Sequence, residues 1–163
     1  MDKQILQKAV SLWLEYVQSR RALLADGYIR SFKKPEADFS EWLVAFLFDG
    51  RLPPSKTNPG YDVITDDKRI QVKSVAKAAD NKNGYIIDER DRSNDPRTGA
   101  THYAFVFFDE LIPSAIFLAP EAFVRNFGST QIRRSDLEKK DFKIDVDLNV
   151  FNDPILRHQS QQG

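Results

Sequence analysis

Residues 60–74 read GYDVITDDKRIQVKS, and this stretch decides the expected fold. Polar and apolar residues alternate along residues 69–74, with the period of a strand that buries one face. The polar residues 66–68 predict a turn, so residues 60–64 and 69–74 are expected to pair in a β-hairpin that spans residues 60–75. Because side chains alternate across a strand, Gln71 and Lys73 should share one face, while Ile70 and Val72 point into the core.

The hairpin brings three kinds of polar group to one edge of a sheet. Asp62 precedes Gln71 by nine residues, and the turn folds its strand back alongside the next. A carboxylate, an amide oxygen and the ammonium of Lys73 would then converge. Oxygen ligands of this kind hold hard divalent cations, and a lysine can stand beside a phosphate. The arrangement favours metal-dependent cleavage of phosphodiester bonds.

Composition limits the other possibilities. The 163 residues are 41% hydrophobic and 12% aromatic, which indicates one globular domain spanning 1–163. The absence of cysteine excludes disulfides, thiol catalysis and thiolate zinc sites, and two histidines disfavour a histidine-rich metal site. Equal numbers of basic and acidic residues (24 each) do not indicate strong non-specific binding of nucleic acid, but they allow a local basic face.

No signal-peptide pattern and no long apolar run are found in the sequence. We therefore expect a soluble, cytoplasmic protein without a membrane partner. The tail, residues 159–163, is expected to be disordered.

Two N-terminal helices are expected within residues 2–50. Residues 2–26 follow a helical repeat typical of an amphipathic packing helix, which Gly27 ends. Asp38 and Glu41 match a capping box at the start of a second helix. Residues 42–48 are apolar all round, so this helix should be buried, and residues 49–50 should end it.

The second half of the chain is expected to contribute strands and one helix within residues 103–150. Residues 85–87 are the one ordered segment expected within residues 76–101. Strands are predicted at 103–108, 114–118 and 142–148, the first buried on both faces, and a helix at 120–124 with Pro120 in its first turn. The order predicts an α/β (α+β) domain, a mixed central β-sheet flanked by helices.

Asp62 followed by Gln71-Val72-Lys73 resembles the active-site signature of the PD-(D/E)XK nucleases, the restriction-endonuclease-like superfamily. That pattern has Pro-Asp on one strand and an acid or Gln, any residue and Lys on the next. Here Pro59 lies three positions before the Asp rather than directly before it. The Gln at the acid position is similar to the Gln-x-Lys variant of Mrr-like restriction enzymes. Many members place a Glu on the preceding helix, where Glu41 stands.

This resemblance implies a role for each site residue. Asp62 would bind Mg²⁺, for which Mn²⁺ is expected to substitute. The amide oxygen of Gln71 and the backbone carbonyl of Val72 would join it, and Lys73 would stabilise charge on the phosphate and orient or deprotonate water. Glu41 would bind the metal through water or hold a second cation, although its place in a capping box explains it equally well.

Two functions remain open at this point. One is a Mg²⁺-dependent endonuclease of restriction, defence or repair type that acts on nucleic acid, DNA in particular. Cleavage of a duplex would then call for a homodimer or a recognition partner. The other is a catalytically weak or inactive accessory module that keeps the fold and binds DNA with a partner.

Simpler structural roles compete with each assignment. Asp62 can cap a backbone amide, and Gln71 and Lys73 can be ordinary exposed strand residues, so only the triplet favours a site. Ser74 could bond a phosphate, but a serine at the end of a strand needs no such role. His102 is expected to be structural. Five basic residues lie among acids in a polar segment that reads as a solvated loop: Lys77, Lys82, Arg90, Arg92 and Arg97.

Overall fold

The computed structural model of this chain describes residues 3–54, 60–76, 84–87, 99–109 and 111–152. The helices are α1 (Lys3–Ala25), α2 (Pro35–Leu47), α4 (Glu121–Arg125), α5 (Arg134–Glu138) and the 3-10 helix η1 (Leu148–Asn152). The strands are β1 (Val63–Ile64), β2 (Arg69–Ala76), β3 (Gly84–Ile86), β4 (His102–Asp109), β5 (Ile112–Pro120) and β6 (Gln131–Arg133).

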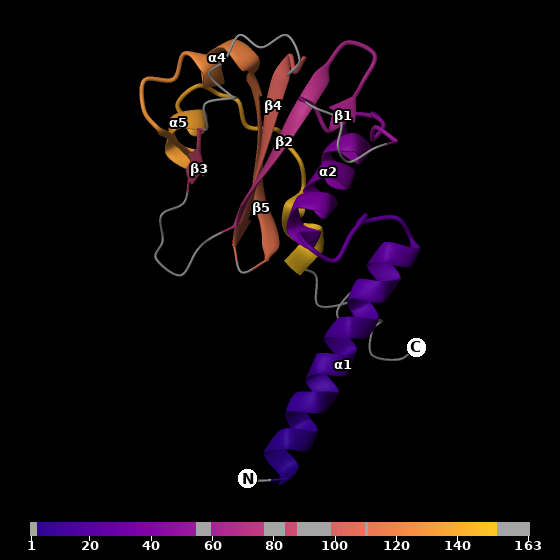
Figure 1. The fold of residues 1–163 in the computed structure, drawn as a ribbon. Coiled ribbons are helices and arrows are strands. Elements are labelled where there is room, and N and C mark those ends of the chain that lie inside the picture. The colour runs from indigo at the N-terminus through magenta and orange to yellow at the C-terminus, as the bar shows by residue number, and fades with distance from the viewer. Residues whose placement is uncertain (1–2, 55–59, 77–83, 88–98, 110, 153–163) are drawn as a thin grey trace.

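A mixed four-stranded sheet forms the centre of the molecule, in the order β1-β2-β4-β5 (Figure 1). β2 runs parallel to β4, with Lys73 opposite Phe105, and the two outer pairs are antiparallel. β3 and β6 form a second, two-stranded antiparallel sheet. The predicted mixed sheet flanked by helices is confirmed, as is the turn that pairs β1 with β2.

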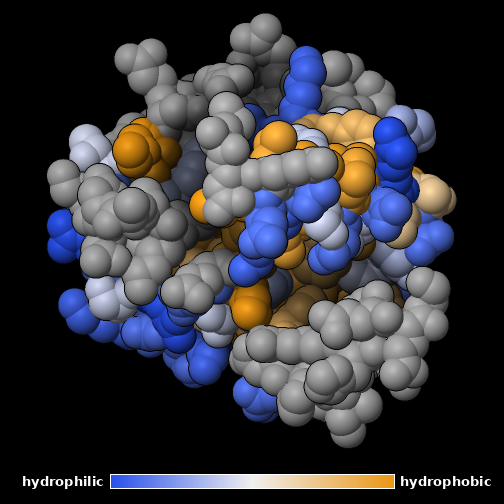
Figure 2. Space-filling view, turned by 90° about the horizontal axis from the view of Figure 1, so that it is seen from below, coloured by the Kyte–Doolittle hydropathy of each residue, from blue (hydrophilic) through white to orange (hydrophobic). Residues whose placement is uncertain are grey.

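α1 departs from the prediction of a packing helix. It has nearly the expected bounds and ends before Gly27, whose φ is +76°. However, it projects away from the sheet and packs broadly on no other helix or strand of the described residues (Figure 1). Seen from the end at which α1 projects, the surface has hydrophobic side chains beside hydrophilic ones (Figure 2). No helix in the described ranges is long and apolar enough to cross a membrane.

α2 covers one face of the sheet, because its apolar side packs on the even-numbered residues of β2 and β4. Leu43, Val44 and Ala45 are buried against Ile70 and Val72 and their neighbours on this face. The expectation of a helix buried all round is wrong at Phe46, which is 70% exposed. The helix ends at Leu47, and residues 48–50 turn the chain toward β1.

Gly50 lets the chain pass close to β1. A Cβ at this position would lie 2.8 Å from the Val63 side chain and 2.9 Å from the Ile64 carbonyl oxygen. The close approach allows Arg51 and Ile64 to exchange backbone hydrogen bonds of 2.8 and 3.0 Å. The start of the site hairpin is therefore anchored to the segment that follows α2.

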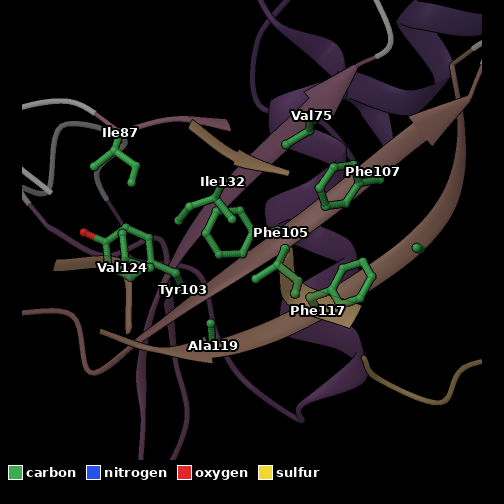
Figure 3. Packing of buried hydrophobic residues seen from close by; sticks show 11 residues of the cluster. Val75, Ile87, Tyr103, Phe105, Phe107, Phe117, Ala119, Val124 and Ile132 are labelled. Carbon is green, nitrogen blue, oxygen red and sulfur yellow. The ribbon is translucent and has the colours of Figure 1, made fainter. Parts of the chain in front are cut away.

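The opposite face of the sheet carries an aromatic core (Figure 3). Phe105 and Phe117 are fully buried at its centre, and the rings of Phe107 and Phe117 meet edge to face at 5.6 Å. α4, β6 and α5 close this core with one fully buried residue each: Val124, Ile132 and Leu137. β6 and α5 lie in a mostly polar stretch for which the sequence predicted no element. Pro120 precedes α4 as its N-cap rather than sitting in its first turn.

The strand predicted at residues 142–148 does not form. Lys143 makes one isolated bridge to Phe117 of β5, and Ile144 donates to the Ile116 carbonyl. The alternation has a different cause, because Phe142 packs on the aromatic core while Ile144 and Val146 pack on the α2 side. This segment wraps the edge of β5 and buries apolar side chains on both sides of the sheet.

Candidate functional site

Asp62 lies at the point where β1 begins and the chain turns away from β2. Gly60 makes that turn with φ +103°, a conformation that favours glycine. The Asp62 amide donates to the Ile70 carbonyl at 2.8 Å, which is the last backbone bond on this side of the pair. Two residues further along β2, the Val72 amide donates to a side chain instead of to a backbone carbonyl of β1. Its acceptor is Oδ2 of Asp62, at 2.8 Å.

Gln71 joins Asp62 directly. Its Nε2 donates to the same Oδ2 of Asp62, so the amide lies against the carboxylate. The N–H and C=O of one strand residue point to the same side of the strand, so the Val72 carbonyl faces the edge where Asp62 lies. The structure thus brings Asp62, Gln71 and the Val72 backbone together, as the hairpin predicted.

Lys73 lies on the aromatic face of the sheet, one residue beyond Val72. Its ammonium stands 4.8 Å from the ring centre of Tyr85 and 5.8 Å from that of Tyr103. Cations over aromatic rings are attracted by the ring quadrupole. Lys73 is also close enough for its charge to act on Asp62. The two tyrosines therefore hold the ammonium beside the site, a role that the sequence pattern did not reveal.

Glu41 comes to the site from α2, and not as part of a capping box. The helix begins at Pro35 with Lys34 as N-cap, so Asp38 lies inside it and that prediction is wrong. Asp38 is buried and instead accepts the backbone amides of Arg30 and Ser31 at 2.8 and 2.6 Å. Glu41 therefore has no capping role, and its contacts are with other residues.

Arg30 is the residue that sequence reasoning missed. Its guanidinium forms an ion pair with Glu41 and donates to the Pro53 carbonyl at 3.1 Å. Its Nε is buried without a hydrogen-bond partner in the described part of the chain. Nothing in the spacing points to Arg30, because the contact depends on how the connection between α1 and α2 folds back over the helix.

Both carboxyl groups are held in an environment that disfavours their charge. Burial raises the pKa of Asp62 above its ordinary 3.8, although the Val72 amide, Lys73 and Arg30 act in the opposite direction. Burial, and after it the charge of Asp62, raise the pKa of Glu41 above 4.5, while Arg30 lowers it. Glu41 and Asp62 are thus near enough to repel each other, and a cation between them would relieve that repulsion.

The donor set fits a hard divalent cation. Asp62 and the Val72 carbonyl would supply an anionic and a neutral oxygen at one edge, and Glu41 a second carboxylate. The amide oxygen of Gln71 would join them if the amide, whose Nε2 now donates to Asp62, turned over. Within the described ranges no three acids, histidines or cysteines come together, so the site would depend on these mixed oxygen donors. Arg30 competes for Glu41, which favours Asp62 as the first ligand.

The remaining polar residues contribute less. His102 begins β4, and its Nδ1 lies 3.0 Å from the Thr101 hydroxyl. Burial lowers its pKa, and so does the charge of Lys68. Ser74 lies on β2 next to Lys73. Five basic residues fall outside the described residues: Lys77, Lys82, Arg90, Arg92 and Arg97.

No protein-family model matches this chain, and no curated protein is significantly similar to it in sequence.

Proposed function

We propose that this protein is a metal-dependent nuclease that hydrolyses phosphodiester bonds, with DNA as the expected substrate. One observation carries the proposal: Asp62 bonds both Gln71 and the Val72 amide at the sheet edge, with Lys73 charged beside them. A half-buried carboxylate beside an amide side chain, a backbone carbonyl and an ammonium suits a phosphate group with its metal ion, once the Gln71 amide turns its oxygen toward the metal.

Each residue has a distinct role in this proposal. Asp62 binds Mg²⁺ or Mn²⁺ with the Val72 carbonyl and the Gln71 amide oxygen, and the metal supplies Lewis-acid activation of the phosphate and water. Lys73, held by Tyr85, stabilises the charge that develops on the phosphate and orients the attacking water. Glu41 serves as a ligand through water or for a second cation once Arg30 releases it.

The test is a cleavage assay on supercoiled plasmid, single-stranded DNA and RNA with Mg²⁺ or Mn²⁺. The variant Lys73→Ala should lose about 100- to 1,000-fold in rate, the usual effect of removing one transition-state charge contact. Lys68→Ala is the matched control, because Lys68 pairs with Asp67 in the hairpin turn and lies outside the site. It should cut as the native chain does.

Metal binding is measured separately from cleavage. Calorimetry should show Mn²⁺ binding to the native chain and none to Asp62→Asn. Metal-dependent cleavage that persists in both Lys73→Ala and Asp62→Asn would contradict the proposed site.

A second candidate is an accessory module that keeps the fold without catalysis. The pairing of Arg30 with Glu41 and the donation of Gln71 to Asp62 favour it, because together they satisfy much of the acidic site without a metal. Such a module would bind DNA and need a partner for cleavage. Absence of both cleavage and Mn²⁺ binding in the native chain, with DNA binding retained, would select it over the enzyme.

A further inference from the structure

The apolar side of α1 has no cover from the described chain. Its large side chains are 45–69% exposed in the first two-thirds of the helix: Ile5, Leu6, Val10, Leu12, Trp13 and Tyr16. Trp13 and Tyr16 contact each other, with ring centres 5.4 Å apart, and Arg20 donates to the Tyr16 hydroxyl, but both rings remain exposed. A monomer rarely exposes so much contiguous apolar surface without a partner for it.

These residues follow a heptad repeat. Leu6, Ala9, Trp13 and Tyr16 occupy successive a and d positions, and the flanking e and g positions are also apolar. The opposite side of the helix is polar, apart from Leu14, and carries Gln4, Lys8, Ser11, Glu15 and Gln18. This division predicts a seam for another helix.

One side of the C-terminal part of α1, at Val17, Arg20 and Leu23, is partly covered by the chain that follows it. The Arg20 guanidinium lies 5.2 Å from the ring centre of Phe32, and Val17 and Arg20 line a small hollow with Phe32. The amides of Tyr28 and Ile29 donate to the Leu23 carbonyl. The exposed seam therefore runs from Ile5 to Tyr16, and its occupant must fit those residues.

We propose that a second copy of this chain covers the seam, with the two α1 helices antiparallel. In the antiparallel heptad register, Ala9 faces Trp13 of the second copy and Leu6 faces its Tyr16, and the two-fold axis repeats both pairs. A small residue opposite a large one fills each layer without a void. A parallel pair would place Trp13 on Trp13 and Ala9 on Ala9, which packs poorly.

Charge favours the same arrangement. Four basic residues on α1, Lys3, Lys8, Arg20 and Arg21, outnumber the one acid, Glu15, so the helix is basic. A parallel pair would hold the two copies of Arg20 face to face. In the antiparallel pair they lie at opposite ends of the overlap, about 27 Å apart and well beyond the Debye length.

The area is sufficient for a specific dimer. Large side chains of these types offer about 150–250 Å² each when free, so the exposed fractions leave on the order of 600 Å² per copy. Two copies would bury about 1,200 Å², which is at the lower end of specific protein interfaces. A moderate affinity is expected, with dimers in the micromolar range of concentration. This inference stands apart from the proposed nuclease activity.

Sedimentation equilibrium of the full chain tests the interface. The native chain should approach twice the chain mass as its concentration rises. Trp13→Glu should remain monomeric with its circular dichroism melt unchanged, because α1 contributes little to the packed domain. Gln18→Glu adds the same charge on the polar side and should still dimerise. A native chain that stays monomeric, or equal mass in all three proteins, would overturn the proposal.

Cross-linking tests the orientation, since the chain has no cysteine of its own. Near the two-fold axis, Leu12 lies beside Leu12 of the second copy, whereas the two copies of Leu6 are roughly 15 Å apart along the helices. Leu12→Cys should therefore be joined by a short bismaleimide and Leu6→Cys should not. The reverse result would overturn the antiparallel arrangement.

A membrane surface is the competing occupant of a basic amphipathic helix. Flotation with vesicles of phosphatidylcholine and phosphatidylserine distinguishes it. The lipid surface is the occupant if the native chain stays monomeric and floats with the vesicles. In that case Trp13→Glu should lose both the flotation and the fluorescence change that lipid induces, and the dimer proposal would be overturned.

Discussion

Helices α1 and α2 follow each other in the chain and are both rich in large apolar residues, yet they end in opposite environments. Val44 of α2 is fully buried against the sheet, whereas Leu12 of α1 is 57% exposed. α2 also places Glu41 beside the site, while α1 reaches away from it. An apolar face predicts that a helix packs on something, but it does not tell whether the same chain supplies the covering surface.

The largest expected effect is the difference in stability lost when a charge is introduced into α2 and into α1. Val44→Asp buries a charge in the core and should cost more than about 4 kcal/mol, enough to unfold much of the protein. Leu12→Asp should cost under about 1 kcal/mol, because its side chain already meets water. Thermal melts followed by circular dichroism, at a concentration where the chain is monomeric, measure both. Equal losses would mean that α1 packs on the domain in solution.

The next effect concerns the ion pair that ties α2 to the connection before it. Arg30→Ala leaves Glu41 half-buried without its partner and should destabilise the fold by about 2 kcal/mol. Glu41→Gln in the same chain should restore part of that loss, because it removes the unpaired charge. Denaturant unfolding of the two single variants and the double variant gives the coupling energy. Strict additivity would show that Arg30 and Glu41 do not interact energetically.

A smaller effect should appear at Asp62, and its sign depends on pH. The raised pKa means that the folded protein holds this proton more tightly than the unfolded chain does. This tighter proton binding stabilises the folded protein while Asp62 is protonated. The stabilisation is lost as the pH rises from 3.8, the ordinary pKa, through the raised pKa of the folded protein. At neutral pH, Asp62→Asn should raise the Tm by a few degrees, the shift that about 1 kcal/mol produces in a chain of this length.

The rise in Tm caused by Asp62→Asn should become smaller as the pH falls below the pKa that Asp62 has in the unfolded chain. Melts across the acid range measure it, with Asp141→Asn as a control on the exposed surface. A lower Tm for Asp62→Asn at neutral pH would show instead that the hydrogen bonds from Val72 and Gln71 outweigh the cost of burying the charge.

The smallest expected effect lies within α1 itself. Leu14 is exposed but sits outside the heptad seam, so Leu14→Gln should change stability by less than about 0.5 kcal/mol and leave the dimer intact. Leu12→Gln, two residues earlier and in the seam, should weaken dimerisation at least tenfold. Sedimentation of the two variants compares them, and equal weakening would place the interface on a wider surface than the seam.

The hairpin at residues 60–74 shows how far sequence reasoning reached. Alternation and a polar turn were enough to place Gln71 and Lys73 on one face and Asp62 alongside, because a strand has a fixed period and a short turn fixes the pairing. The buried strand at 103–108 was equally clear, since residues 103–108 are all buried. These are local patterns, and local geometry determines them.

The errors have a common physical cause. The alternation of residues 142–148 is real, but Phe142 and Ile144 pack on opposite sides of the sheet edge without a continuous ladder. The Asp38 and Glu41 spacing fits a capping box, but the helix starts earlier, at Pro35, and Asp38 caps the preceding connection instead. In each case, contacts with another segment of the chain determined which structure the sequence pattern formed.

The sequence by itself therefore determined the α/β class, the hairpin and the triplet of Asp62, Gln71 and Lys73, because these depend on period and on neighbours in the chain. Only the tertiary structure brought Arg30 to Glu41 and Tyr85 to Lys73, and only it left the seam of α1 exposed among the residues that the structure describes. Those contacts join residues through the packing of the whole domain, which no local pattern encodes.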